Sequence, residues 1–289
     1  EATFSAFLRH YSSDFIAEAG IGGNYKFIRT FETRQLNSPE KEIQPFSIDR
    51  PSANGMIGLA YNPSKLLTLK SNLSTGFRAA NLAELASNGL HEGIFRYEIG
   101  DPNLKVEQNL CADFNLEINQ KTLFVSLSAY YNHFFHYIYL APTQETFFGF
   151  QVFRYRQQSA RLFGGELELI AKPAALPAFQ WKESFVVTNG QLDDGDYLPF
   201  IAPYRLVSSL RWEQKTGKKI THLFLEPAFE YVWAQEKPAN FETRTPAYHL
   251  LNFNAGMTTV FGKRSIQWTL SGKNLLDEAY VDHLSRLKQ

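Results

Sequence analysis

Apolar and polar residues alternate with a period of two along most of this chain, and this pattern constrains its fold more than any other feature. Ile266, Trp268 and Leu270, for example, alternate with Ser, Gln and Thr residues across 265–271. In a strand this spacing places one set on each face, whereas a helix would need a spacing of three or four residues. We identify about twelve such runs, bounded by turn-forming residues. They cover residues 2–9, 14–29, 51–62, 66–78, 105–119, 122–140, 151–172, 178–191, 203–214, 220–235, 246–261 and 265–274. The pattern predicts an all-β protein.

The connections between these runs alternate between short and long. The short ones are residues 12–14, 62–65, 119–121, 172–177, 214–219 and 262–264. The long ones are residues 30–50, 79–104, 141–150, 192–202, 236–245 and 275 onward. In an antiparallel sheet, successive connections lie at opposite ends of the strands. We therefore expect tight turns at one end and large excursions at the other. Several runs are also longer than an average strand, which has about five or six residues. Many are longer than the roughly nine to eleven residues with which a strand crosses a bilayer.

The two faces of the predicted strands differ in chemistry. One face is nearly free of charge and is expected to carry aromatic residues near the long-connection end, namely Tyr131, Phe135, Tyr137, Tyr139, Phe229, Tyr231 and Trp233. The other face carries carboxylates, and those expected to face the lumen of a barrel are Glu166, Glu168, Glu226 and Glu230. Apolar strand centres with aromatic ends and a polar opposite face are typical of an antiparallel transmembrane β-barrel. A large soluble sandwich or jelly roll is the alternative.

Composition and motifs argue against several classes of function. Lysine and arginine together number 29, as do aspartate and glutamate, so no basic excess indicates a nucleic-acid partner. Cys111 is the only cysteine in the sequence, which excludes an internal disulfide and a cysteine-based zinc finger. The sequence contains no GxSxG, HExxH or P-loop motif. We therefore expect no catalytic residues, no protein-bound metal and no resident cofactor.

Motifs at the ends of the predicted strands resemble those of a known family. The segments are GFRAANLAEL (76–85), DPNLKVE (101–107) and SGKNLLDEAY (271–280). They are similar, in the same order, to the GFRAP-like, NPNLKPE-like and NLFDKxY-like boxes of TonB-dependent outer-membrane receptors. The segments 126–138 and 164–169 also resemble strands of that family. The resemblance covers essentially the whole chain and is strongest to receptors from Bacteroidetes-type bacteria.

The resemblance implies a protein of the bacterial outer membrane that imports a scarce nutrient with energy from TonB. Receptors of this family have an N-terminal plug domain inside a barrel of about 22 strands. Because the chain begins with Glu1 and holds about twelve strands, we expect residues 1–289 to be the C-terminal part of such a barrel, without the plug. The implied partners are the TonB complex, contacted through a plug segment absent from this chain, together with outer-membrane lipid and the nutrient. The long excursions would lie outside the cell.

The long connection at residues 79–104 is the expected place of ligand capture. Candidate ligand-binding residues in and beside it are Arg78, Asn81, His91, Glu92, Arg96, Tyr97 and Asn103. The arginines could bind an anionic chelate, although ion pairs with nearby carboxylates explain any one of them more readily. His91 lies between two family boxes, where haem receptors of the family carry a histidine, and an imidazole can ligate haem iron. A solvated loop histidine is the alternative.

We predict an importer and not an enzyme, with a ferric siderophore or a similar metal chelate as the favoured ligand. A haem receptor that uses His91 and a passive porin-like channel are the alternatives within a membrane. A soluble carbohydrate-binding β protein is the alternative outside one.

Overall fold

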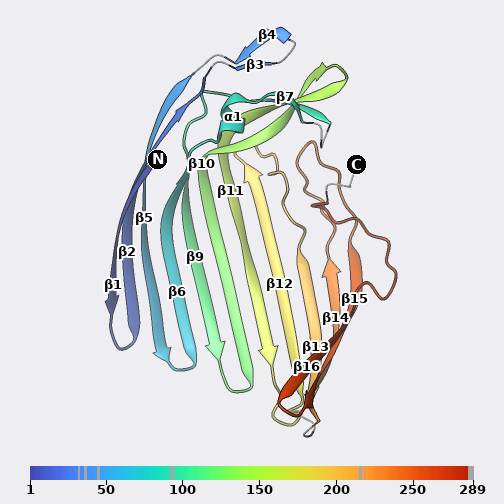
Figure 1. Cartoon of the computed structure of the whole chain (residues 1–289). Coiled ribbons are helices and arrows are strands. Elements are labelled where there is room, and N and C mark those ends of the chain that lie inside the picture. Colours follow the sequence, from blue (N-terminus) through green and yellow to red (C-terminus); the bar gives the residue numbers. More distant parts are fainter. Residues whose placement is uncertain are drawn as a thin grey trace.

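A computed structural model describes residues 1–31, 33–35, 38–43, 46–91, 93, 95–214, 217 and 219–285. Among these residues the main sheet has 14 strands, and all except β7 and β8 form a single path in chain order (Figure 1). The path consists of β1 (Ala2–Tyr11), β2 (Phe15–Arg29), β5 (Ser47–Ser64), β6 (Leu67–Arg78), β9 (Glu107–Asn119), β10 (Leu123–Phe147), β11 (Phe150–Ala171), β12 (Phe179–Leu192), β13 (Arg205–Gln214), β14 (Ile220–Val232), β15 (Tyr248–Phe261) and β16 (Arg264–Gly272). Each strand of this path pairs antiparallel with the next, so the wall is a continuous meander.

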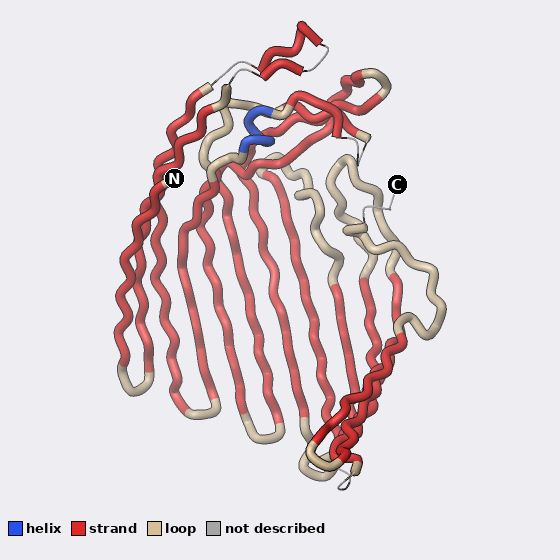
Figure 2. The backbone as a smooth tube through the Cα atoms, in the orientation of Figure 1, coloured by secondary structure: helices blue, strands red, loops and turns tan. Residues whose placement is uncertain are grey.

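The long connections contain further elements. These are β3 (Thr33–Gln35), β4 (Ser38–Ile43), α1 (Leu82–Ala86), β7 (Asn88–His91) and β8 (Arg96–Ile99). Figure 2 shows the short turns at one end of the wall and the large excursions at the other, as the alternation of connection lengths predicts. The connection predicted at residues 141–150 is an exception, because β10 and β11 extend to a tight turn with left-handed φ values of 49° at Phe148 and 84° at Gly149.

The wall is an open, curved sheet and not two packed sheets, which rules out the sandwich alternative. Within the described part of the chain, β1 pairs only with β2 and β16 pairs only with β15.

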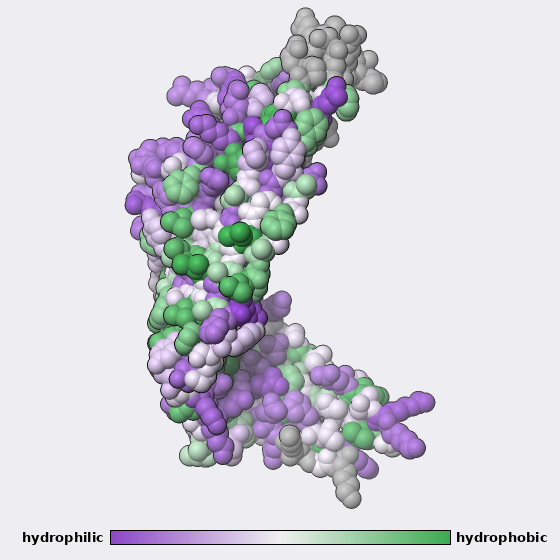
Figure 3. Space-filling view, turned by 90° about the vertical axis from the view of Figure 1, so that its left-hand side faces the viewer, coloured by the Kyte–Doolittle hydropathy of each residue, from purple (hydrophilic) through white to green (hydrophobic). Residues whose placement is uncertain are grey.

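Hydrophobic residues gather at mid-height of the strands seen in Figure 3, with hydrophilic residues mainly above and below them. The side chains of Leu8, Ile21 and Leu270 on the wall are 68–72% exposed, which a water-facing surface would not favour. The predicted fold class, an all-β antiparallel sheet that forms part of a barrel wall, is confirmed. In the part of the chain that the structure describes, no helix has the length and apolarity needed to cross a membrane.

The predicted carboxylate face is continuous across neighbouring strands. Glu168 pairs with Ser184, Ser184 with Val207, and Val207 with Glu230, and directly paired residues share a face. Period-two alternation places Glu166 and Glu226 on the same face. Three of these carboxylates have a cation nearby, at 2.9 Å for Glu168–Lys182, 2.9 Å for Glu226–Arg211 and 2.7 Å for Glu230–Arg205. That this face lines a lumen stays a prediction.

The grouping of aromatic residues on β10 was predicted wrongly. Phe134 pairs with Ala160 but Tyr137 pairs with Gln158, so β10 holds one extra residue between these pairs, and His136 there has a φ of 60°. Such a β-bulge reverses the face of every residue after it. Tyr131 and Phe135 therefore stay on the outer, exposed face, whereas Tyr137 and Tyr139 join Phe134, whose ring lies 5.2 Å from that of Tyr137.

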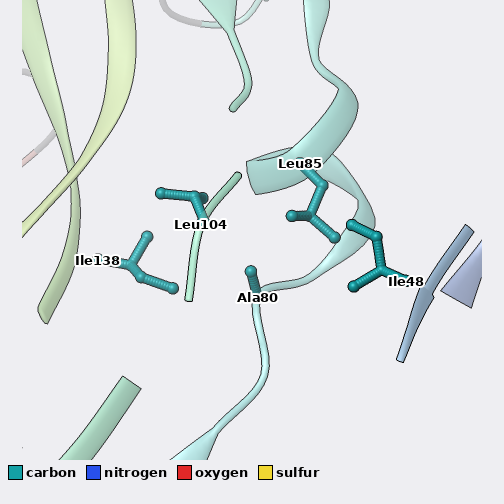
Figure 4. Packing of buried hydrophobic residues seen from close by; sticks show 5 residues of the cluster. All are labelled: Ile48, Ala80, Leu85, Leu104 and Ile138. Carbon is teal, nitrogen blue, oxygen red and sulfur yellow. The ribbon is translucent and has the colours of Figure 1, made fainter. Parts of the chain in front are cut away.

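Two apolar clusters fix the upper part of the β10–β11 hairpin. On one side, Ile138 packs with Ile48, Ala80, Leu85 and Leu104 (Figure 4). On the other side, Ala160 packs with Leu192 and Leu198, and Tyr137 and Tyr139 lie against them. The hairpin is thus held between the excursion at residues 79–104 and the connection at residues 193–204.

Candidate functional site

The excursion at residues 79–104 is a folded cap on the long-loop end of the wall. Its α1 helix is followed by the hairpin of β7 and β8. β8 pairs in parallel with the upper part of β11, with Arg96 opposite Gln151 and Ile99 opposite Arg154. The cap therefore extends the β10–β11 hairpin sideways, and its position is set by backbone hydrogen bonds.

A capping box begins α1. The side-chain oxygen of Asn81 accepts a hydrogen bond of 2.9 Å from the backbone N–H of Glu84, and the Glu84 carboxylate accepts one of 2.8 Å from the backbone N–H of Asn81. These bonds satisfy two of the amide groups left unpaired in the first turn of a helix. Asn81, a candidate ligand contact, thus has a structural role.

Arg78 ties the cap to the wall. Its Nη1 lies 2.8 Å from each carboxylate oxygen of Glu84, and its Nη2 lies 3.0 Å from Oε2 of Glu107. The side chains of Glu84 and Glu107 are 11% and 10% exposed. Glu107 also accepts a hydrogen bond of 2.7 Å from the backbone N–H of Ile138. One guanidinium therefore joins β6, α1, β9 and β10.

The DPNLKVE segment closes the cap from below. The Asp101 carboxylate accepts a hydrogen bond of 2.8 Å from the backbone N–H of Asn103, which forms a tight turn. Leu104 is 2% exposed in the core, and its carbonyl oxygen accepts a hydrogen bond of 2.8 Å from Arg50. The side chain of Asn103 is exposed.

Arg96 and Tyr97 also make internal contacts. Arg96 donates a hydrogen bond of 2.7 Å to Glu98, and its guanidinium lies 5.1 Å from the centre of the Phe153 ring. Tyr97 is 4% exposed and donates a hydrogen bond of 2.8 Å to the side chain of Asn88. Burial and a fixed hydroxyl make Tyr97 part of the packing of the cap.

His91 is exposed at the end of β7, and Glu92 lies outside the described residues. The structure therefore brings Arg78 and Asn81 together around Glu84, and it holds Arg96 and Tyr97 in the body of the cap. His91 and Asn103 remain at the surface. Ligand binding by any of these residues stays a prediction.

The neighbouring excursions are linked by hydrogen bonds that sequence reasoning missed. Asn240 donates a bond of 2.6 Å to Asp196, and Gln235 donates one of 2.8 Å to the carbonyl of Ile201. Hydrogen bonds from the Gln158 side chain and then from the Asp196 N–H hold the pKa of Asp194 below its ordinary value. These contacts join residues 193–204 and 235–245 into one rim.

The segment after β16 packs back onto this rim. Both groups of the Asn274 side-chain amide hydrogen-bond to the backbone of Glu278 at 3.0 Å, and Asn274 has a φ of 50°. The ring of Tyr280 stacks on that of Tyr248 with centroids 4.4 Å apart. The buried ring of His283 lies 3.2 Å from the Thr245 hydroxyl. The SGKNLLDEAY motif is thus a turn that its own asparagine closes.

A cavity of about 610 Å³ lies along the face predicted to line the lumen. Its lining includes Glu18, Lys70, Asn72, Asp113, Tyr130 and Glu166. Lys70 is paired with Glu117 at 2.6 Å, and Asn72 donates a hydrogen bond of 3.3 Å to Asp113. Glu18 and Lys70 at this cavity are paired with opposite charges, and the lining also includes apolar side chains such as Met56 and Phe114.

Comparisons with known proteins agree with this architecture. A model of the β-barrel of TonB dependent receptor-like proteins matches residues 11–275. Similar solved structures include the copper transporter OprC, with 17% identity, a TM-score of 0.80 and coverage of 98% of this chain and 43% of that one. The FrpB iron transporter from Neisseria meningitidis has 14% identity and a TM-score of 0.69, covering 98% and 42%. The ferric yersiniabactin uptake receptor FyuA from Yersinia pestis has 15% identity and a TM-score of 0.69, covering 96% and 41%. The chain spans less than half the length of each, and at these identities the likeness shows the fold alone.

Proposed function

The chain belongs to the family of TonB-dependent receptor-like β-barrels, and we propose that it forms the C-terminal part of an outer-membrane receptor that imports a metal chelate with energy supplied through TonB. The observation that carries this proposal is the family match over residues 11–275. The polar face, the outward apolar band and the folded cap at the long-loop end support it.

Each part of the chain has a role in this proposal. The long-loop end, which contains the cap and the linked rim, faces outward and receives the ligand. The polar face borders the passage, where Glu168, Glu226 and Glu230 are paired with cations and offer no large field of one sign. A plug in a longer chain would fill the passage and carry the contact with TonB.

The names of the similar structures support a metal-bearing ligand. They describe a copper transporter and receptors for iron and for ferric yersiniabactin. A small metal chelate is expected to bind in a partly enclosed site, through a few polar and aromatic groups held in fixed positions. His91 and Asn103, exposed on the cap, and Arg78, whose side chain is 41% exposed, are the proposed contacts on the cap side.

Binding by the intact receptor tests this proposal. The receptor that contains this chain is purified in detergent and titrated calorimetrically with a ferric trihydroxamate, a ferric catecholate, a copper chelate and haemin. We expect saturable binding of a non-haem metal chelate. Binding of none of the metal chelates would overturn the proposal, and binding of haemin alone would replace it with the haem-receptor alternative.

A further inference from the structure

Aromatic rings from separate excursions meet at the long-loop end. The ring of Phe153 on β11 lies 6.1 Å from that of Phe241, in the connection between β14 and β15. The ring of Phe200, in the connection between β12 and β13, lies 6.5 Å from that of Phe241. Both pairs are close to edge-on, at interplanar angles of 87° and 69°. This is a favoured geometry for aromatic pairs, and the residues come together only through the tertiary fold.

Phe200 is held in an unfavourable backbone state that presents its ring outward. Its φ is 59°, a left-handed value that is rare for a bulky residue, and its side chain is among the exposed hydrophobics at 64%. Strain of this kind persists where the surroundings fix it, and it concentrates at binding sites.

The carboxylate of Glu242 holds the backbone at Phe200. Oε1 of Glu242 accepts a hydrogen bond of 3.1 Å from the backbone N–H of Phe200. Its Oε2 accepts one of 3.1 Å from the backbone N–H of Ala239, and the side chain is 7% exposed. Glu242 directly follows Phe241, so this largely buried carboxylate links the connection that carries Phe241 to the backbone of Phe200.

A cation borders the same aromatic group. The guanidinium of Arg96 lies 5.1 Å from the centre of the Phe153 ring, and its Nε donates to Glu98 at 2.7 Å. A guanidinium has five N–H donors in a planar fork. Aromatic faces with a fixed cation at their border suit a ligand that carries both aryl rings and anionic oxygens.

We propose that Phe153, Phe200 and Phe241, together with Arg96, form a binding platform for a chelate whose metal-binding arms are aryl rings with anionic oxygens. This inference rests on the proposed function and narrows its ligand to the aryl class. A purely aliphatic chelate would leave the rings without stacking partners.

Phe148 provides a matched control. Like Phe200, Phe148 has a left-handed φ, here 49°, and an exposed side chain, at 87%. Its ring contacts Phe147 at the tip of the β10–β11 hairpin, at a centroid distance of 4.6 Å. Replacement of Phe148 thus removes an exposed, strained ring without touching the platform.

The test compares variants of the intact receptor in detergent. Phe200→Leu, Phe241→Leu and Phe148→Leu are titrated with the ferric complex of catechol and with a ferric trihydroxamate, and resistance of the folded barrel to SDS checks that each variant folds. We expect the catechol complex to bind and to lose affinity about three- to tenfold in each platform variant, with less than a twofold change in Phe148→Leu.

Catecholate binding that is indifferent to Phe200 and Phe241 would overturn the platform. Binding of the trihydroxamate alone would overturn the aryl class and leave the proposed function standing. If the receptor bound neither complex and no other metal chelate, both the aryl class and the proposed function would be overturned.

Discussion

The Nη1 atom of Arg78 lies 2.8 Å from both carboxylate oxygens of Glu84, six residues further along the chain. Arg78 ends a strand of the wall and Glu84 lies in the α1 helix of the cap. The same guanidinium reaches Glu107, where the chain re-enters the wall. The excursion therefore leaves and returns through one cluster of charges.

Arg78→Ala is expected to loosen the cap. It would leave Glu84 and Glu107 largely buried without their cation, at a cost of about 2 to 3 kcal/mol in the free energy of cap opening. Hydrogen exchange of the amides between residues 82 and 104 measures this cost. Lys70→Ala is the control, because it removes an exposed ion pair on the same strand, and should change exchange by less than about 1 kcal/mol. Equal protection in the two variants would show that the Arg78 cluster does not hold the cap.

Gly164→Ala is expected to disrupt the wall. A Cβ at this position would overlap the carbonyl oxygen of Val187 and lie 2.7 Å from the Tyr130 hydroxyl. Overpacking of this kind costs about 1 to 3 kcal/mol, measured here by urea unfolding of the intact barrel in detergent. At Gly23, also in the wall, the nearest atom to a new Cβ is 4.0 Å away. If Gly23→Ala proved as destabilising as Gly164→Ala, the close approach of the Val187 carbonyl and the Tyr130 hydroxyl to Gly164 would not be the cause.

Asn274 offers a test of the SGKNLLDEAY turn. Asn274→Gly keeps the left-handed backbone accessible but removes the two hydrogen bonds to Glu278, at a cost of about 1 kcal/mol. Asn274→Ala adds the strain of an alanine at positive φ and should cost about 2 to 3 kcal/mol. Proteolysis rates within residues 275–283 should therefore rise from wild type to glycine to alanine. A glycine variant that is cleaved faster than the alanine variant would contradict the turn.

His91→Ala is expected to leave haemin titrations of the intact receptor unchanged. His91 is exposed at the end of a short strand, and histidines that ligate a metal usually have a hydrogen-bond partner that fixes the ring. The Soret band reports ligation directly. A saturable Soret shift that weakens tenfold or more in His91→Ala would establish the haem-receptor alternative.

The strands could be predicted from the sequence because apolar and polar residues alternate along each of them, which gives one apolar and one polar face. A run such as Leu67–Phe77 in β6 needs no tertiary information to be assigned. The bulge at His136 was missed because one extra residue leaves the local composition unchanged while it reverses the faces of Tyr137 and Tyr139. The Phe148–Gly149 turn was missed because such turns usually carry Asn or Asp in place of phenylalanine.

The site was predicted less well than the fold. Charged residues in an excursion look alike in a sequence whether they bind a ligand or each other. Arg78 and Asn81 proved to share Glu84, which depends on the path of the chain between them. Phe153, Phe200 and Phe241 were overlooked because they lie in separate connections, and only the fold brings their rings together.

The most direct test of the account is the energy dependence of uptake. Bacteria that express the intact receptor take up a radioactively labelled metal chelate that it binds, with and without an uncoupler and with and without a functional TonB. If import is active, accumulation requires the receptor and falls to background when either the proton gradient or TonB is removed. Accumulation that persists without both would show a passive channel and contradict active import.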